Sequence, residues 1–174
     1  MKKLLEVIAL NADDARNSGG ADSLEIVQNM PLGGLTPDFD TLRAIRDAVS
    51  IKLNVIIRPH ARDFVYSPAE SEVILRDAEH AVRLGADGIV FGALTSDSGV
   101  DFALFDQVTA VCRSINPAVI MTFHRAIESA HDPDSALEML CGRADRVLCS
   151  GLPPGAPDDA PRTLLRDWMH AYGS

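Results

Sequence analysis

The sequence predicts an α/β domain in which short strands alternate with helices, and two observations support that fold class. The first is a series of short apolar runs rich in strand-favouring residues, each followed by a loop and a helical pattern. The second is their spacing of about 30 residues, the length of one strand–helix unit. This alternation is typical of a parallel sheet with helices packed outside it, of which a closed barrel is the simplest form. The runs lie at residues 4–10, 23–28, 51–58, 88–92, 118–123 and 145–150.

The length of the chain limits how complete such a barrel can be. With 174 residues, 47% of them hydrophobic, the chain can build one substantial core but not two ordinary domains. A closed eight-stranded barrel usually takes about 250 residues. We therefore expect an incomplete (β/α) TIM-barrel-like fold with about six strand–helix units over residues 1–151. Residues 152–174 are expected to add a proline-rich connection and a C-terminal helix to the same domain.

Charge and composition restrict the partners. The chain has 16 Lys and Arg against 25 Asp and Glu, a formal charge of -9, which disfavours nucleic acid and anionic membrane surfaces as partners. No stretch approaches the roughly 20 apolar residues that a membrane helix needs. The three cysteines lack C-x-x-C spacing and are expected to be reduced thiols. We expect a cytoplasmic protein. Because an open barrel leaves strand edges unpaired, we also expect a homodimer or a higher homo-oligomer.

Helix starts are marked by a capping side chain followed by proline, which suits the first helical position. The sequence also repeats an Ala-Asp pair before a strand in three places, after glycines that can end a helix in the left-handed conformation. We interpret this as a structural repeat. The helix starts are Thr36-Pro37, Ser67-Pro68 with Glu70 completing a capping box, and Asp132-Pro133; the repeats span residues 19–27, 84–92 and 142–150.

Charged residues within apolar strands predict the position of a site. Glu6 and Glu25 interrupt the first two strands, and side chains of barrel strands alternate between the helix layer and the interior. Burial against the helices would be costly for a charge, so both glutamates should point inward. The same alternation places Asn54 and Arg58 inside, and the fifth strand delivers His124 to the mouth of the barrel.

These inward groups suggest a binding site for a small anion. Arg58 could hold a carboxylate or phosphate, while His124 or one of the glutamates, Glu6 or Glu25, moves a proton. The alternative is a structural salt-bridge network that plugs the barrel. Arg58 and His124 are the better functional candidates, because they lie at carboxyl ends of strands, where barrel active sites form.

Two loops extend this candidate site. Residues 29–36 contain glycines and lead into a helix start, where backbone N–H groups can face an anion, although a plain turn is the alternative. Residues 59–66 are rich in polar and aromatic groups, as pocket-lining loops often are. Within this loop Asp63 and Tyr66 either contact a ligand or serve as a turn residue and a packing residue.

Seven motifs, taken together and in order, resemble the copper homeostasis protein CutC family over about residues 4–151. The resemblance implies a cytosolic (β/α) barrel, often oligomeric and frequently described as copper-binding. The family's recurrent polar positions correspond here to Glu6, Glu25, Arg58, Arg62, Asp63, His124 and Arg125. Among them we take Glu6, Glu25 and His124 as catalytic candidates, and Arg58, Arg62, Asp63 and Arg125 as substrate-binding candidates. The motifs are GGAD-x-LE at 19–25, GGLTP at 33–37, IIRP at 56–59, RDFVYS at 62–67, GADGIVFGAL at 85–94, TFHRA at 122–126 and RVLCSG at 146–151.

The chain departs from this family in two ways. Members commonly continue past the sixth strand into two more units, and members proposed to bind copper have cysteines in the first or second strand, where this chain has Ile8, Ala9 and Val27. Cu(I) prefers soft ligands, and Met30 and Cys149 are the only soft candidates near the strand ends. We therefore assign no metal ligands, and copper is implied by the resemblance alone. Three hypotheses stay open: a copper homeostasis protein, an enzyme using Arg58 and His124, or an inactive remnant.

Overall fold

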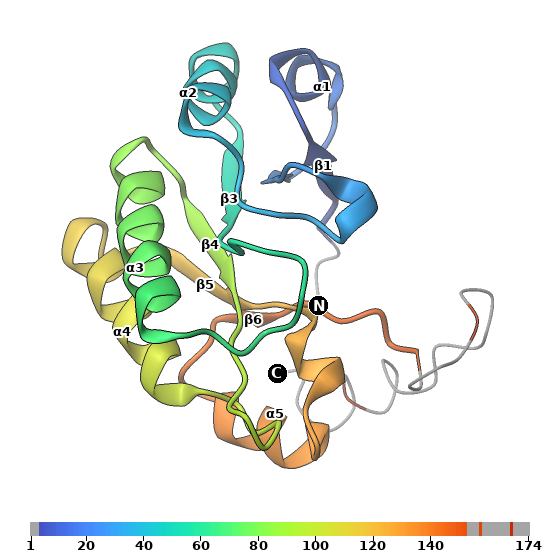
Figure 1. The fold of residues 1–174 in the computed structure, drawn as a ribbon. Helices are drawn as coiled ribbons and strands as arrows, with labels where there is room; N and C mark the ends of the chain where they lie inside the picture. Colours follow the sequence, from blue (N-terminus) through green and yellow to red (C-terminus); the bar gives the residue numbers. More distant parts are fainter. Residues whose placement is uncertain (1–3, 153–156, 158–167, 169–174) are drawn as a thin grey trace.

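Six parallel strands form one sheet whose spatial order follows the sequence. The structure is a computed structural model that describes residues 4–152, 157 and 168. Each strand pairs in parallel with the next one, and the sheet curls into an open barrel (Figure 1). The six predicted strands are confirmed, each shorter than its apolar run. Their bounds are β1 Glu6–Ala9, β2 Ser23–Ile26, β3 Lys52–Ile56, β4 Gly88–Phe91, β5 Ile120–Phe123 and β6 Arg146–Val147.

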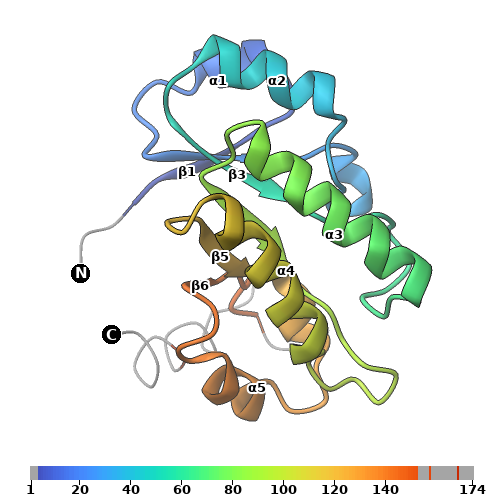
Figure 2. The same cartoon turned by 90° about the vertical axis from the view of Figure 1, so that its left-hand side faces the viewer.

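The helices follow the strands in alternation and lie outside the curled sheet (Figure 2). Two short 3-10 helices occupy the loops after β2 and β5. The predicted incomplete (β/α) barrel is therefore confirmed for the described residues. The α-helices are α1 Ala12–Asn17, α2 Phe39–Ala48, α3 Pro68–Arg83, α4 Phe102–Ile115 and α5 Pro133–Leu140; the 3-10 helices are η1 Met30–Leu32 and η2 Arg125–Ser129.

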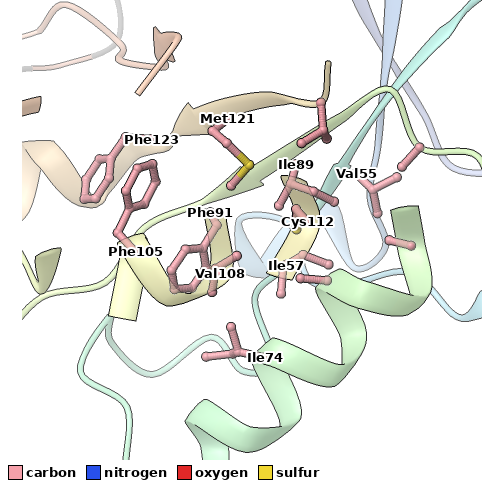
Figure 3. Packing of buried hydrophobic residues seen from close by; sticks show 14 of the residues in the cluster. Val55, Ile57, Ile74, Ile89, Phe91, Phe105, Val108, Cys112, Met121 and Phe123 are labelled. Carbon is pink, nitrogen blue, oxygen red and sulfur yellow. The ribbon is translucent and has the colours of Figure 1, made fainter. Parts of the chain in front are cut away.

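The main core lies between the outer face of the sheet and the helices. Phe105 of α4 packs between Phe91 and Phe123, with ring centroids 6.3 Å and 5.5 Å away (Figure 3). Ile74 of α3 is fully buried in the same cluster. Alternate strand residues point into this layer, which agrees with the predicted inward position of Asn54. The strand residues of this layer include Leu24, Ile26, Leu53, Val55, Ile57, Ile89, Phe91, Met121 and Phe123.

The repeated Ala-Asp pair has a direct structural explanation. In each copy the aspartate Oδ2 accepts a hydrogen bond from a backbone N–H at the start of the preceding strand, and each repeat thereby ties one strand to the previous one. The bonds run from Leu5 to Asp22 (2.8 Å), from Leu53 to Asp87 (3.0 Å) and from Met121 to Asp145 (2.8 Å). A glycine with positive φ precedes each aspartate: Gly20 and Gly85 lie two residues before theirs, and Gly142 lies three residues before Asp145.

Two of the three predicted helix starts are correct. Ser67 forms the complete capping box with Glu70, and Asp132 accepts a hydrogen bond from the Ser135 N–H. The start at Thr36-Pro37 is wrong, because α2 begins at Phe39 and Asp38 caps it by accepting from the Thr41 N–H. Thr36 Oγ1 instead accepts a hydrogen bond from the backbone N–H of Arg58, so its hydroxyl is engaged in the site described below.

The sheet has an open edge at β1, which pairs only with β2 among the described residues. Leu5 and Ile8 on this edge are 54% and 44% exposed. This agrees with the exposed edge expected from sequence, while the homo-oligomer stays a prediction. The predicted C-terminal helix falls mostly outside the described residues, although Trp168 packs against the core and donates from Nε1 to Asp134 Oδ1 at 2.7 Å. No helix among the described residues is long and apolar enough to cross a bilayer.

Candidate functional site

A cavity of about 520 Å³ opens on the inner face of the sheet. It contains four of the seven predicted site residues, which come from β2, from the residues after β3 and β5, and from η2. The lining therefore combines charged groups with aliphatic walls. The lining residues are Ile8, Glu25, Val27, Met30, Gly33, Gly34, Ile56, Arg58, Phe64, His124, Arg125, Glu128, Ser129 and Leu148.

Arg58 is a buried cation, 8% exposed, held by backbone oxygens. Its Nη1 lies 3.3 Å from each of three carbonyl oxygens, those of Leu32, Gly33 and Gly34. Among the described residues no carboxylate lies within ion-pair distance of the guanidinium. Its Nε is enclosed and has no hydrogen-bond partner among the described residues. The cation is therefore fixed in place but not neutralised.

The loop after β2 supplies these carbonyls because its glycines adopt left-handed backbone conformations. Gly33 and Gly34 both have φ of 83°. A Cβ on Gly33 would lie 3.1 Å from Arg58 Nη1, so a side chain there would crowd the guanidinium. The sequence left two interpretations of this loop open, backbone N–H groups that face an anion and a plain turn. The N–H groups of Leu32 and Gly33 bond to carbonyls within the loop, as in a turn. Carbonyl oxygens turn inward instead, because the buried guanidinium needs acceptors.

His124 is a second unpaired donor. It is 3% exposed, and its Nδ1 accepts a hydrogen bond from the backbone N–H of Ala126 at 3.3 Å. Burial, and then the neighbouring charge of Arg58, lower the pKa of His124 to about 3. The imidazole is therefore neutral at physiological pH and carries its proton on Nε2. That Nε2 is enclosed without a partner among the described residues.

Phe64, from the loop after β3, lies against both donors. The Arg58 Cζ is 4.9 Å from the Phe64 ring centroid, and the His124 ring centroid is 5.0 Å away in an edge-on arrangement. The loop 59–66 thus lines the cavity as predicted, but through Phe64. Tyr66 packs on Phe91 instead, with a ring-centroid distance of 6.2 Å.

Glu25 and Glu128 are the acidic residues of the lining, and Glu128 is the one paired with Arg125. The side chain of Glu25 points inward from β2, and the residue is 9% exposed. Burial, and then the neighbouring Glu6, raise the pKa of Glu25 to about 7. A proton on this carboxyl can therefore be gained or lost near neutral pH, which suits proton transfer.

Glu6 points toward the same interior but has a separate set of partners. It accepts hydrogen bonds from Ser23 Oγ and Asn54 Nδ2, and Arg146 Nη1 lies 3.9 Å away. Gly88 lies beside Asn54, where a Cβ would collide with the amide oxygen. Glu6 does not line the cavity, and its place on the open edge leaves its side chain 34% exposed. It acts on the site through its charge next to Glu25.

The other predicted residues lie at the rim or beyond it. Arg125 lines the cavity but pairs with Glu128, with Nη2 and Oε2 2.9 Å apart. Arg62 is exposed and pairs with Glu70 on α3. Asp63 is a turn residue whose Oδ1 accepts from the Val65 N–H at 3.1 Å. Arg62 and Asp63 therefore do not join Arg58 and His124.

Sequence reasoning missed three residues that shape the site. Phe64 belongs to a loop in which the sequence analysis singled out Asp63 and Tyr66 instead. Glu128 lies in a short 3-10 helix without a strand pattern. Gly92 follows β4, and a Cβ there would lie 2.5 Å from His124 Nδ1. A glycine directly after an apolar strand is the one signal that could have indicated close approach of another group.

The donor set does not suit Cu(I). Met30 is the only soft side chain in the lining, and Cys149 is half-buried outside it. Burial raises the pKa of the Cys149 thiol, which disfavours the thiolate that a metal requires. Among the described residues, no three His, Cys, Asp or Glu side chains are grouped to hold a metal ion. The cavity presents a guanidinium and an imidazole N–H, which are groups that attract anions.

Comparison with known proteins identifies the family. The CutC family model matches residues 4–165. The chain belongs to the CutC family. It is 40% identical over 161 residues to the copper homeostasis protein cutC homolog of Homo sapiens, a match covering 91% of this chain and 58% of that protein. It is 38% identical over 156 residues to a CutC family protein of Bacteroides thetaiotaomicron, covering 87% and 61%. The chain thus spans about three fifths of the length of these CutC relatives.

Solved structures agree with this assignment. The crystal structure of a copper homeostasis protein CutC from Streptococcus agalactiae superposes with a TM-score of 0.79 and 25% identity, covering 90% of this chain and 77% of that one. A phosphonopyruvate hydrolase solved with oxalate and Mg²⁺ gives a TM-score of 0.62 at 16% identity, covering 95% and 64%. This second likeness supports the barrel fold of the CutC chain and nothing further.

Proposed function

We propose that this CutC-family protein serves copper homeostasis, as the names of its relatives indicate, and that its cavity binds a small carboxylate or phosphate anion rather than a copper ion. The observation that carries the proposal is the pair of enclosed, unpaired donors, Arg58 Nε and His124 Nε2, behind one aromatic ring. Leaving a buried donor unpaired costs about 1–3 kcal/mol, so two unpaired donors on residues that line one cavity favour a missing acceptor.

The alternative to an anion site is a structural salt-bridge network that fills the interior of the barrel. It requires a carboxylate on Arg58, and the described residues supply only carbonyls there. Carbonyl oxygens hold the guanidinium without cancelling its charge, so the cation stays available to a ligand. An anion would reach the two donors when the Phe64 ring turns aside.

Glu25 supports an enzymatic version of the same proposal. His124 stays neutral and serves as a hydrogen-bond donor, because its pKa of about 3 is too low for it to take up a proton at neutral pH. Glu25, with a pKa of about 7, is the group suited to proton transfer. In this proposal Arg58 and His124 bind the anion, and Glu25 transfers a proton.

Calorimetric titration of the full chain tests the proposal with four anions: acetate, 3-methylbutanoate, succinate and inorganic phosphate. We expect saturable binding of at least one anion at one site, weakened at least about tenfold in Arg58→Lys, which removes the guanidinium fork. Arg76→Lys, at an exposed side chain of α3, is the matched control and should bind as the wild type does. Binding of none of them, or equal binding by Arg58→Lys, would overturn the proposal. A ligand-induced shift of the His124 Nε2 NMR signal gives a readout that needs no variant.

A cytoplasmic location and a homo-oligomeric state stay predictions. The first rests on the acidic composition and on the reduced thiols expected from sequence. The second rests on the exposed apolar side chains of the β1 edge. Light scattering of the purified chain tests the second, and a monomer at micromolar concentration would contradict it.

A further inference from the structure

We infer that the ligand is a monocarboxylate with a compact apolar body, and that dianions are excluded. The inference rests on the proposed function, since it concerns the same cavity. Three features carry it: the number of charges that face the cavity, the free edge of the guanidinium and the aliphatic walls.

The charges that face the cavity can neutralise one negative charge. Arg58 is the one cation of the described lining without a carboxylate partner, because Arg125 is paired with Glu128. His124 contributes a neutral N–H. From β1 and β2, Glu6 and Glu25 add acidic groups to the same interior, and Arg146 of β6 reaches only Glu6. A second negative charge on the ligand would therefore meet carboxylates and no further free cation.

The unpaired edge of the Arg58 guanidinium, formed by Nε and Nη2, matches a planar carboxylate. Nη1 is occupied by the three loop carbonyls, whereas Nε has no partner and Nη2 makes no hydrogen bond to a described residue. Two parallel N–H groups on one edge of a guanidinium form the bidentate pair with a carboxylate. The His124 Nε2–H can then donate to the same oxygen pair, which completes one anion subsite.

The remaining wall is aliphatic. Val27 and Ile56 belong to a small buried cluster on the inner face of the sheet, against which Leu148 packs. Ile8 comes from β1, which pairs with β2, and all four residues line the cavity. A cavity of about 520 Å³ exceeds what a bare carboxylate fills, and pockets of this size bury ligands through apolar contact. The body of the ligand should therefore be uncharged and branched or ring-shaped.

The affinities of the four anions, measured by calorimetry at pH 6.5, test the inference. At this pH Glu25 is mostly protonated. We expect 3-methylbutanoate to bind at least about tenfold more tightly than acetate, succinate or inorganic phosphate. Leu148→Ala should reduce the affinity advantage of 3-methylbutanoate over acetate. Glu25→Gln should narrow the affinity advantage of 3-methylbutanoate over succinate at pH 8, where the carboxyl of the wild type is mostly negative. Succinate or phosphate binding as tightly as 3-methylbutanoate would overturn the inference and leave the proposed function intact. Absence of binding by all four would overturn the proposed function itself.

Discussion

The carbonyl oxygen of Gly33 accepts a hydrogen bond from Arg58 Nη1 at 3.3 Å. A Cβ on the same glycine would lie 3.1 Å from that nitrogen. One residue thus both anchors the guanidinium and leaves room for it. The loop and the cation depend on each other, because the carbonyls would otherwise face an apolar interior.

Gly33→Ala should weaken anion binding at least about tenfold. The new methyl group crowds Nη1 and displaces the guanidinium from the cavity. Alanine at φ of 83° also costs about 1–2 kcal/mol of stability. Gly142→Ala is the matched control, because Gly142 has φ of 78° with nothing within 4 Å of its Cβ position. Calorimetry and thermal unfolding of both variants separate the two effects: equal binding losses would contradict a specific role of Gly33.

Anion affinity should fall as pH rises through 7. Glu25 is neutral below its pKa of about 7 and negative above it, and the negative form repels an anion in the same cavity. If only the protonated form binds, the affinity drops about tenfold between pH 6 and pH 8. Titrations across this range check the slope. Glu25→Gln should bind with little dependence on pH, and an unchanged slope in this variant would assign the titration to another group.

Stability should follow the same titration. The pKa of Glu25 is raised in the folded protein from 4.5 to about 7, so the protonated form is favoured on folding. The stability that this group contributes is fully present below pH 4.5 and is lost as pH rises through 7. The loss is on the order of 3 kcal/mol. Chemical unfolding at pH 5 and pH 8 should therefore show Glu25→Gln gaining stability over the wild type at pH 8 only.

Phe64→Ala should speed anion association several-fold. The ring lies against both Arg58 and His124, so its removal opens a path to the two donors. Phe39→Ala removes another half-buried ring, stacked on His80 outside the cavity, and serves as the control. Stopped-flow measurement of the association rate constant gives the comparison. An unchanged rate in Phe64→Ala would mean that ligands enter by another route.

Cu(I) should find no stoichiometric site in the cavity. Titration under reducing conditions with a competing chelator is expected to show only weak binding, and Met30→Leu and Cys149→Ser should remove what little remains. One equivalent of Cu(I) that stays bound in the double variant would show that the ligand argument is wrong. The chain would then hold copper through nitrogen or oxygen donors that soft-ligand reasoning undervalues.

Much of this fold could be predicted because short sequence patterns determine its strands, helix starts and strand entries. Apolar runs, capping residues and the repeated Ala-Asp pair each act over a few residues, and strand alternation then placed Glu25 and Arg58 inside. The partners of Arg58 could not be predicted, since they depend on two glycines taking positive φ in a loop without a sequence period. Thr36 shows the same limit, because its hydroxyl serves Arg58 across the fold rather than the adjacent helix.

The sequence predicted the positions of candidate residues in loops less accurately than those in strands. Arg62 and Asp63 stood in a loop that the sequence marked as polar, but their side chains satisfy neighbours within that loop and its helix. Phe64, between them and Tyr66, turns inward instead. Strand residues alternate by geometry, whereas loop side chains have no such constraint.

The most direct test of the central claim is a crystal structure of the protein with 3-methylbutanoate. The account predicts a carboxylate in hydrogen-bond contact with the Nε and Nη2 of Arg58 and with His124 Nε2, with the Phe64 ring moved aside and the carbonyls of Leu32, Gly33 and Gly34 still on Nη1. A ligand bound elsewhere, with both donors still enclosed behind Phe64, would contradict it.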